Sequence, residues 1–458
     1  MDAIFQDKLQ AMLAEGRRDG CFPSAACAVG AGDELLAQAF VGEAPLPGCA
    51  PVDEHTRYDM ASLSKVLGPT MIALRAIEDG LLSLDETVGD IFPFAPEDKR
   101  SITVRMLMTH TGGFYPDFKL SKLIKSPEQT LECILNYPLM EKPGVRPIYS
   151  CMGYILFTKM LEERLGKPLN MLAEERVFGP LGMSETGYCP PADCVCAATE
   201  VSKVTGKPWI GIVHDENARF QRGVSGNAGV FIPLVDGVRF ARMLAAMCGG
   251  FLRRETMEMA ITNYTPGQEE HRGLGFHLAG TPLCFFSDRV PERCFGHTGF
   301  TGTSLIVEPE TGFWVMLLSN RVYPTRETAA EAIRRRDMFV LEEDGCIKAA
   351  AIINKTQVDA YEGAKWSFAA DDNEVCVLHT LVVDPQYAGQ GIGKRFVAFY
   401  EKYALSRRCA VLRIDTNAIN VAARSMYAKL GYREADIAPC VFNGIPNVDL
   451  VLLEKKLK

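Results

Sequence analysis

The pattern of apolar and polar residues predicts alternating helices and strands from the first residues of the chain. Residues 1 to about 20 carry apolar side chains at helical spacing, which predicts a surface helix. Residues 25–39 predict two strands around a turn at Gly30-Ala31-Gly32-Asp33. The apolar run 66–80 predicts a buried helix, and Gly80 is a residue that can end it.

Further patterns place helices in the middle of the chain and strands near residue 300. Tyr149 opens an apolar helical run to about Leu165, and a second helix is predicted near 234–248. Residues 295–320 predict two strands joined by a hairpin turn at 308–312. Strands from both ends of this region predict an antiparallel sheet packed against the helices.

The pattern of apolar and polar residues changes after Asn320, and this change predicts a second α/β domain. We expect a multidomain α/β protein with domains at 1–325 and 326–458. The elements expected in the second domain are a charged helix at 326–336, a hairpin at 338–353 with an Asp-Gly turn, a strand at 375–383 and a helix at 395–407.

Composition narrows the class of protein. The 458 residues are too many for one ordinary core, and 47% hydrophobic with 23% charged residues describes a globular protein. A net charge of -8 argues against nucleic acid or an anionic membrane as the partner. With no signal peptide or membrane span, we expect a cytoplasmic protein in which the 15 cysteines stay reduced. No complete metal-ligand pattern is present, and no metal is expected.

Ser62 and Lys65 form the first candidate for chemistry. On a helix, residues three apart share a face, so a nucleophile and its proton acceptor would point into the same space. Ser62 would also lie near the positive end of the helix dipole, which favours a developing alkoxide. By itself the spacing is weak, because a serine at this place can simply cap a helix.

Two later motifs give this pair a context. The three motifs, in chain order, are Ser62-x-x-Lys65, Tyr149-Ser150-Cys151 and His297-Thr298-Gly299. In this order they resemble the serine β-lactamase and penicillin-binding protein superfamily, and most closely its class C, carboxypeptidase and esterase branch. Stretches at 107–113, 180–186, 213–218 and 296–304 resemble further blocks of that family. The resemblance covers about residues 5–325.

The resemblance implies roles for these residues. Ser62 would be the acylated nucleophile, with Lys65 and Tyr149 removing its proton and Tyr149 returning that proton to the leaving group. A lysine acts as a base only when its pKa falls, and burial is expected to lower the pKa of Lys65. The backbone N–H groups of Ser62 and Phe300 resemble the family's oxyanion hole.

The substrate-binding motifs depart from the family at two places. His297 stands where a lysine is usual and, with Thr298 and Gly299, would bind substrate through a group whose charge depends on pH. Cys151 replaces the usual Asn or Asp, and a thiol is a poor hydrogen-bonding group. Small esters or other non-lactam acyl donors therefore become the favoured substrates. Cys151 as a packing thiol or as a second nucleophile both stay open.

A glycine-rich segment in the second domain predicts an anion-binding site. It joins a strand to a helix N-terminus, although a plain structural turn explains the same pattern. With the stretch 411–433, it resembles the GNAT N-acetyltransferase superfamily. The resemblance implies acetyl-CoA as substrate and Tyr427 as the acid that protonates the departing thiolate. The implied acetyl-CoA-binding residues are Val383, Gly389, Gln390, Gly391, Ile392, Gly393, Lys394 and Asn420.

The second domain also departs from its family. Ala388 stands where an Arg or Gln usually leads the loop, and no room exists for the first strand and helix before Met338. The acceptor site would then be completed by the first domain or another subunit, or be impaired. His379 or Glu374 could serve as base, and a structural role for His379 stays equally open.

These features support a serine hydrolase that forms an acyl-Ser62 intermediate from a small ester or amide, fused to a shortened acetyltransferase-like domain. One alternative is an acyltransferase that passes the acyl group to an alcohol or amine. A second alternative is a non-catalytic binding module, which the departures at Cys151 and Ala388 suggest.

Overall fold

The computed structural model divides into two compact units, Met1–Tyr323 and Pro324–Lys458, which are described separately below. It describes residues 3–457 except 19, 203, 281–289, 327–336, 344–345, 358–360, 362, 372–373, 388 and 443–444. Within these residues, no helix is long and apolar enough to cross a membrane.

The first unit is built on an antiparallel sheet that joins both ends of its chain. Among the described residues its six strands run in the order β2-β1-β11-β10-β9-β8, and β1 pairs with β11 so that Ala28 lies opposite Met316. The strands are β1 Ala25–Ala31, β2 Glu34–Val41, β8 His277–Leu278, β9 Phe295–Thr298, β10 Ser304–Glu308 and β11 Phe313–Ser319. The expected antiparallel sheet with strands from both ends is confirmed.

The prediction of two strands over 295–320 is wrong, because this segment forms three. A tight turn at 299–303 separates β9 from β10, and the Gly299 N–H donates to the Thr303 carbonyl over 2.7 Å. A strand pattern does not reveal so short an interruption, since the apolar residues on either side keep alternating.

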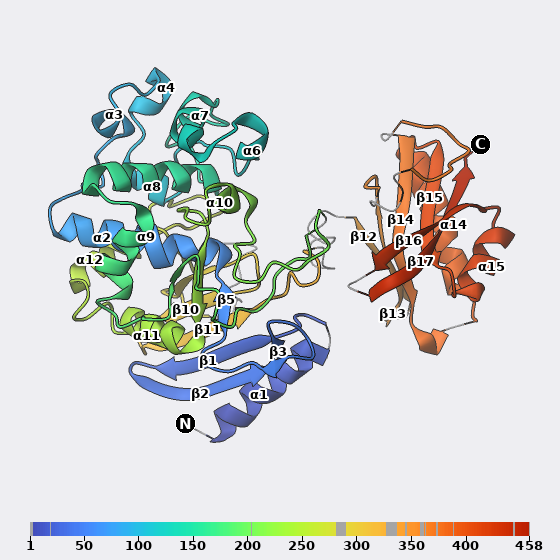
Figure 1. The fold of residues 1–458 in the computed structure, drawn as a ribbon, viewed down its shortest axis with the longest axis horizontal. Helices are drawn as coiled ribbons and strands as arrows, with labels where there is room; N and C mark the ends of the chain where they lie inside the picture. Colours follow the sequence, from blue (N-terminus) through green and yellow to red (C-terminus); the bar gives the residue numbers. More distant parts are fainter. Residues whose placement is uncertain are drawn as a thin grey trace. The chain divides into compact units, whose positions relative to one another are not determined.

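Helices cover both faces of this sheet (Figure 1). The helix α1 packs on β2, and α11 packs against β1 and β11. Side chains of β1 alternate between the two faces of the sheet. Ala25 and Cys27 pack with Leu13 of α1, while Ala26 and Ala28 pack in the main core on the other face. The helices are α1 Ala3–Arg18, α2 Met71–Glu78, α3 Val88–Ile91, α4 Glu97–Arg100, α5 Val104–Met108, α6 Leu120–Leu123, α7 Thr130–Asn136, α8 Cys151–Leu165, α9 Leu169–Ala173, α10 Glu216–Phe220, α11 Leu234–Ala245 and α12 Arg254–Ala260.

The centre of the helical part is α8, which contacts α3, α5, α7 and α9. Ser150 caps its start, because the Ser150 Oγ accepts the Gly153 N–H over 3.0 Å. Gly166, at a φ of 68°, takes the left-handed conformation that ends it. Short strands complete the unit: β3 Glu43–Ala44, β4 Ala50–Pro51, β5 Arg57–Asp59, β6 Gly187–Tyr188 and β7 Val230–Pro233.

The helix expected at 66–80 is not a continuous α-helix, and a separate turn precedes it. A 3₁₀ turn at Ala61–Leu63 is followed by a π-helical turn at Val66–Thr70 and only then by α2. Pro69 lies within the π turn, and a proline has no N–H for the usual helical bond. Gly80, with a φ of 67°, follows the end of α2.

The second unit is a mixed sheet in the order β12-β13-β14-β15-β17-β16. The strands β14 and β15 are parallel, and α14 forms the crossover between them and packs on β13 and β14. The elements are β12 Met338–Glu343, β13 Cys346–Asn354, β14 Val375–Val383, α14 Ile392–Ser406, β15 Val411–Asn417, α15 Val421–Lys429, β16 Arg433–Phe442 and β17 Ile445–Lys456. The helix expected at 326–336 and the Asp344-Gly345 turn fall outside the described residues, apart from Arg326.

One close approach in the first sheet gives a test of the fold. A Cβ on Gly30 would lie 2.2 Å from Cζ2 of the fully buried Trp314. We expect Gly30→Ala to lower the free energy of unfolding by about 1–3 kcal/mol, because the indole must move within a packed core. Urea denaturation measures the change. Gly187→Ala is the matched control, since a Cβ there meets nothing within 4 Å; equal losses in both variants would contradict the packing argument.

Candidate active site

Ser62 follows a sharp turn at the end of β5. Ala61 has a φ of 44°, which is unusual for a residue with a Cβ. The buried Asp59 holds this turn, because one carboxylate oxygen accepts the Ala61 N–H over 2.8 Å and the other accepts the His214 N–H over 2.6 Å. The strained turn projects Ser62 from the end of the strand into the helical part of the unit.

Lys65 is fully buried beside Ser62 and makes three contacts through its amine. The Lys65 Nζ donates to the Ser62 Oγ over 3.1 Å and to the Asn227 carbonyl over 3.0 Å. Its third contact is with the Cys151 Sγ, over 3.6 Å. An ammonium has three N–H donors, so these contacts match all of them.

Tyr149 and Cys151 reach Lys65 from the start of α8. The Lys65 Nζ lies 4.9 Å from the centroid of the Tyr149 ring. The Ser150 N–H between them donates to His110 Nδ1 over 3.1 Å, which fixes the backbone at this place. The structure therefore brings the first two sequence motifs together around one buried amine.

The charge of this cluster differs from the expectation. Burial lowers the pKa of Lys65, but the attraction of Cys151 and Tyr149 for the ammonium outweighs it, and the pKa of Lys65 is raised. The expected fall in the pKa of this lysine is therefore wrong in its net direction. Burial raises the pKa of the Cys151 thiol despite the nearby lysine, which disfavours the nucleophilic thiolate.

The third motif lies against the segment that carries Ser62. Thr301 Oγ1 donates to the Asp59 carbonyl over 2.6 Å, and Thr303 Oγ1 donates to the Met60 carbonyl over 3.2 Å. A Cβ on Gly299 would lie 2.3 Å from the same Met60 oxygen, so only glycine allows this approach. The turn at 299–303 thus holds the Phe300 backbone beside the start of the Ser62 turn.

His297 is neutral in this environment. Its Nδ1 lies 2.7 Å from the Thr298 carbonyl, which can only accept, so Nδ1 carries the proton and Nε2 carries a lone pair. Burial and the positive charge of Lys65 lower the pKa of His297 to about 3. The expectation that its charge varies with pH is therefore wrong for the neutral range.

Three further residues at this site were not found from the sequence. Arg272, 2% exposed, places its guanidinium 5.2 Å from the Tyr149 ring centroid and its Nη1 3.0 Å from His277 Nε2. The rings of His277 and His297 lie 4.8 Å apart, and His110 lies 4.5 Å from Tyr149. The motif block at 107–113 contained His110, but no sequence signal marked the other two.

Unpaired polar atoms gather at this place. Four buried atoms of this site have no hydrogen-bond partner within the described part of the chain: Tyr149 Oη, His110 Nε2, Asn227 Nδ2 and His297 Nε2. Buried polar atoms are rarely unpaired, so their concentration favours a site that binds a ligand. Among the described residues, no group of His, Cys, Asp or Glu is arranged to hold a metal ion.

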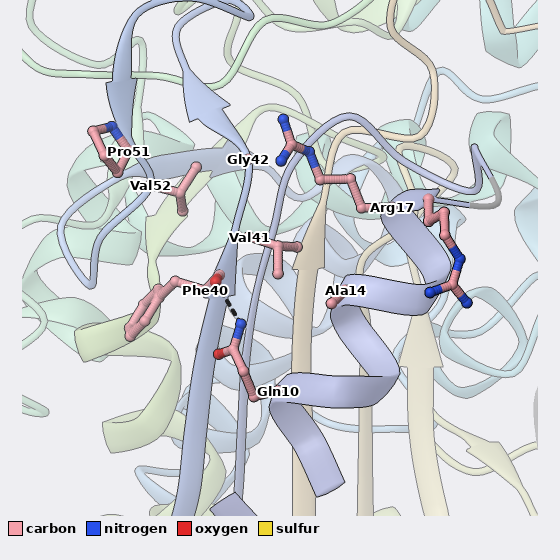
Figure 2. Close-up of a pocket in the computed structure, with 9 residues that line it drawn as sticks. Gln10, Ala14, Arg17, Phe40, Val41, Gly42, Pro51 and Val52 are labelled. Atoms are coloured by element: carbon pink, nitrogen blue, oxygen red, sulfur yellow. Dashed lines mark hydrogen bonds between the residues drawn. The ribbon is translucent and has the colours of Figure 1, made fainter. Parts of the chain in front are cut away.

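A separate pocket of about 600 Å³ lies between α1 and the end of β2 (Figure 2). Gln10 Nε2 donates across it to the Phe40 carbonyl over 3.3 Å. None of the motif residues lines this pocket. It is lined by Gln10, Ala14, Arg17, Arg18, Phe40, Val41, Gly42, Pro51 and Val52.

In the second unit, the glycine-rich turn leads into α14. The strands β14 and β15 pair only over 375–378 and 411–414, so the segment that ends at Val383 runs beyond the paired region. Gly389 and Gly391 have φ angles of 76° and 80°, conformations that suit glycine. Ala388 lies outside the described residues. The other loop residues assigned to acetyl-CoA are Gln390, Ile392, Gly393 and Lys394, which lie in the turn and the first turn of α14.

Asn420 and Tyr427 belong to α15. Asn420 caps this helix, because its Oδ1 accepts the Ala423 N–H over 3.1 Å, so its oxygen already has a structural role. Tyr427 is 4% exposed. Burial and the nearby Asp415 carboxylate raise the pKa of Tyr427, which keeps its proton in place at neutral pH.

His379 lies between carbonyl acceptors and a buried carboxylate. His379 Nε2 is 3.0 Å from the Thr356 carbonyl, so Nε2 carries the proton of the neutral ring. His379 Nδ1 faces Asp415 Oδ2 at 3.9 Å, and Asp415 accepts the Tyr361 hydroxyl over 2.8 Å. Glu374, the other candidate base, is exposed.

The neutral histidines of the first unit predict a pH-dependent stability. The pKa of His297 is about 3 in the folded chain, against about 6.5 when unfolded, so the unfolded chain binds the additional proton below pH 6.5. The free energy of unfolding should therefore fall as the pH drops from 7 to 5, with about 2 kcal/mol of the fall due to His297. Urea denaturation of His297→Gln should show a smaller fall than the unaltered chain.

His55→Gln is the control for this prediction. His55 is exposed, and a hydrogen bond and the charge of Glu185 raise its pKa, so its contribution has the opposite sign. The control should show at least the full fall between pH 7 and 5, because it loses a contribution that opposes the fall. An undiminished fall in His297→Gln would contradict the assignment of a neutral buried ring.

Comparisons with known proteins agree with this architecture. The family model described as Beta-lactamase matches residues 5–338, and the model described as Acetyltransferase (GNAT) family matches residues 309–432. The overlap includes β11, which pairs with β1 in the first sheet. An Escherichia coli K12 protein described as "Putative D-alanyl-D-alanine carboxypeptidase" is 30% identical over 307 residues, covering 58% of this chain and 69% of that protein.

Solved structures share the fold of the first unit. EstCE1, described as a hydrolase with promiscuous acyltransferase activity, matches with a TM-score of 0.58 and 21% identity over 69% of this chain and 93% of its own. The octameric penicillin-binding protein homologue from Pyrococcus abyssi matches with a TM-score of 0.58 and 18% identity over 76% of this chain and 87% of its own. The chain therefore belongs to the Beta-lactamase family and carries a GNAT-family acetyltransferase domain after it.

Proposed function

We propose that the first unit is a serine hydrolase that forms an acyl-Ser62 intermediate with a small ester or amide. The observation that carries this proposal is the contact between the buried Lys65 amine and the Ser62 Oγ, at 3.1 Å. A buried ammonium that donates to a serine oxygen stabilises negative charge as the serine loses its proton. A serine that only caps a helix has no use for such a partner.

Tyr149 is the proton acceptor in this proposal. Lys65 has the raised pKa of an ammonium, and its three donors are engaged, so it offers no lone pair to Ser62. Tyr149, as phenolate, takes the Ser62 proton while the Oγ bonds to the acyl carbon. The departing alkoxide or amine then receives that proton from Tyr149, which restores the phenolate. Water then attacks the acyl-Ser62 carbon and gives its proton to Tyr149. Tyr149 returns this proton to the Ser62 Oγ as the carboxylic acid leaves.

The oxyanion formed in this step needs two N–H donors. Those of Ser62 and Phe300 are the proposed pair, supported by the hydrogen bonds that hold the turn at 299–303 against Asp59 and Met60. Loss of one such donor typically costs about 10²- to 10³-fold in rate. His297, Thr298 and Gly299 line the substrate side of this turn in the proposal.

The acyl donor we favour is a small ester. Cys151 offers a weakly hydrogen-bonding thiol where an amide-binding group is usual, and its Sγ is already in contact with Lys65. The acceptor is water in this proposal. An added alcohol or amine that yields a new ester or amide would identify an acyltransferase instead.

Replacement of Ser62 tests the proposal directly. Ser62→Ala should lower the turnover of a p-nitrophenyl ester by at least about 10³-fold and abolish labelling by a fluorophosphonate probe. Intact mass measures the acyl adduct, and ester hydrolysis measures the rate. Ser121→Ala, at an exposed serine of α6, is the matched control and should behave as the unaltered chain.

A non-catalytic module is the rival, and it predicts no labelling in the unaltered chain either. Turnover and labelling that survive in Ser62→Ala would rule out the proposed nucleophile. Analysis of the products with and without added methanol or a primary amine separates hydrolysis from acyl transfer.

For the second unit, we propose acetyl transfer from acetyl-CoA to an amine. The glycine turn before α14 would hold the pyrophosphate and Asn420 the pantetheine arm. The amine nitrogen attacks the thioester carbonyl, His379 Nδ1 takes the proton that the amine loses, and Tyr427 protonates the departing thiolate. The contact of His379 with two acceptors through Nε2 supports this role, because it leaves Nδ1 with a lone pair.

Calorimetry and acetylation assays test this second proposal. The full chain should bind acetyl-CoA, and Tyr427→Phe should keep that binding while acetyl transfer falls on the order of 10²-fold. His379→Gln should lower transfer, because it removes the group that accepts the amine proton. Tyr432→Phe, on the neighbouring ring 5.8 Å from Tyr427, is the matched control. Absence of binding at millimolar acetyl-CoA would eliminate the proposal.

A further inference from the structure

The Tyr149 ring lies close to two buried cations. The Lys65 Nζ is 4.9 Å from its centroid, and the Arg272 guanidinium carbon is 5.2 Å from it. Lys65 is fully buried and Arg272 is 2% exposed, so water screens neither charge well. The Tyr149 hydroxyl is also buried and has no hydrogen-bond partner within the described part of the chain. Both cations therefore face Tyr149 with little solvent screening.

Arg272 is held in this position by contacts on several sides. Its guanidinium forms an ion pair with Glu270, with the Nε 3.0 Å from the carboxylate, and its Nη1 is 3.0 Å from His277 Nε2. Its backbone N–H donates to Thr265 Oγ1 over 2.9 Å, and its carbonyl accepts the Tyr264 N–H over 2.9 Å. A guanidinium does not lose its proton in proteins, so the site keeps this positive charge at every relevant pH.

The other ionisable groups around Tyr149 carry little charge of their own. Burial and the charge of Arg272 lower the pKa of His110 and of His277 well below the usual value, so both rings are neutral, as is His297. Burial raises the pKa of the Cys151 thiol, which opposes the thiolate.

The acidic groups near Tyr149 act mainly on its neighbours Lys65, Cys151 and Arg272. Asp117 and Asp215 influence the charge of Lys65 and Cys151, and burial raises the pKa of Asp117 to about 6. Glu270 is half-exposed and is bound to the guanidinium itself. The groups that favour a phenolate on Tyr149 are therefore Lys65 and Arg272, while Glu270 opposes Arg272 from its other side.

We infer that Arg272 is a positioning residue that stabilises the phenolate of Tyr149 and so prepares Tyr149 to accept the Ser62 proton. The inference rests on the proposed function, in which Tyr149 is that acceptor. A positive charge close to a phenol favours its phenolate over the neutral form. Arg272 acts through Tyr149 and needs no contact with the substrate.

Two measurements on the full chain test this inference. Ultraviolet difference titration, with Tyr149→Phe as the baseline, reports the ionisation midpoint of Tyr149 without any substrate. The pH dependence of fluorophosphonate labelling at Ser62 reports the reactive form. Arg272→Met should move both midpoints upward by about 1–2 pH units, because one of the two cations is lost. Arg272→Lys should restore most of the shift, since it keeps the charge.

Glu270→Gln should move the two midpoints in the opposite direction from Arg272→Met. It keeps Arg272 but removes the carboxylate that partly neutralises it, so both midpoints should move downward. This variant also keeps the inference testable if Arg272→Met fails to fold, which thermal unfolding would reveal. A purely structural role for Arg272 would lower labelling without moving either midpoint, and that result would overturn the inference.

The inference and the proposed function fail in different ways. If Ser62 is not the nucleophile, labelling survives in Ser62→Ala while the Tyr149 titration still depends on the residue at 272. If the inference is wrong, Ser62→Ala loses labelling as proposed, but the Tyr149 midpoint is the same in the Arg272→Met, Arg272→Lys and unaltered chains.

Discussion

The buried ammonium of Lys65 is the interaction on which the first unit depends. A charge without water costs several kcal/mol unless polar partners surround it, and two of the three partners of Lys65 come from distant parts of the chain. Ser62 precedes it by three residues, Cys151 begins α8, and the Asn227 carbonyl precedes β7. The chain satisfies one cation by bringing these segments together, and the same convergence creates the candidate site.

The sheet supplies the other wall of this site. The strand β1 pairs with β11, which joins the two ends of the unit, and the turn after β9 is hydrogen-bonded to the backbone of Asp59 and Met60. Ser62 thus lies where the end of β9 meets the helices. A site built from two such layers is rigid on both sides, which suits a reaction that needs fixed donors for a developing charge.

Electrostatics divides this site into fixed cations and neutral rings. Lys65 and Arg272 keep their charge, while burial beside them holds three histidines in the neutral form. In the proposed function Tyr149 is the proton acceptor, because the Lys65 amine is engaged with three partners and His297 Nδ1 is held by the Thr298 carbonyl. The proposed path of the proton therefore follows from the surroundings of the motif residues.

The two families, the antiparallel sheet and the motif residues could be predicted from the sequence, because each depends on a local pattern of side chains. Ser62 and Lys65 are three residues apart, and the residues of the glycine turn before α14 follow one another directly in the sequence. Three features appear only in the folded chain. The strand β9 ends at Thr298, the pKa of Lys65 is raised, and Arg272 and His277 lie at the candidate site. These depend on contacts between segments that are separate in the chain, such as Lys65 with Cys151 and Arg272 with Tyr149, and burial and charge arise only when those segments pack together.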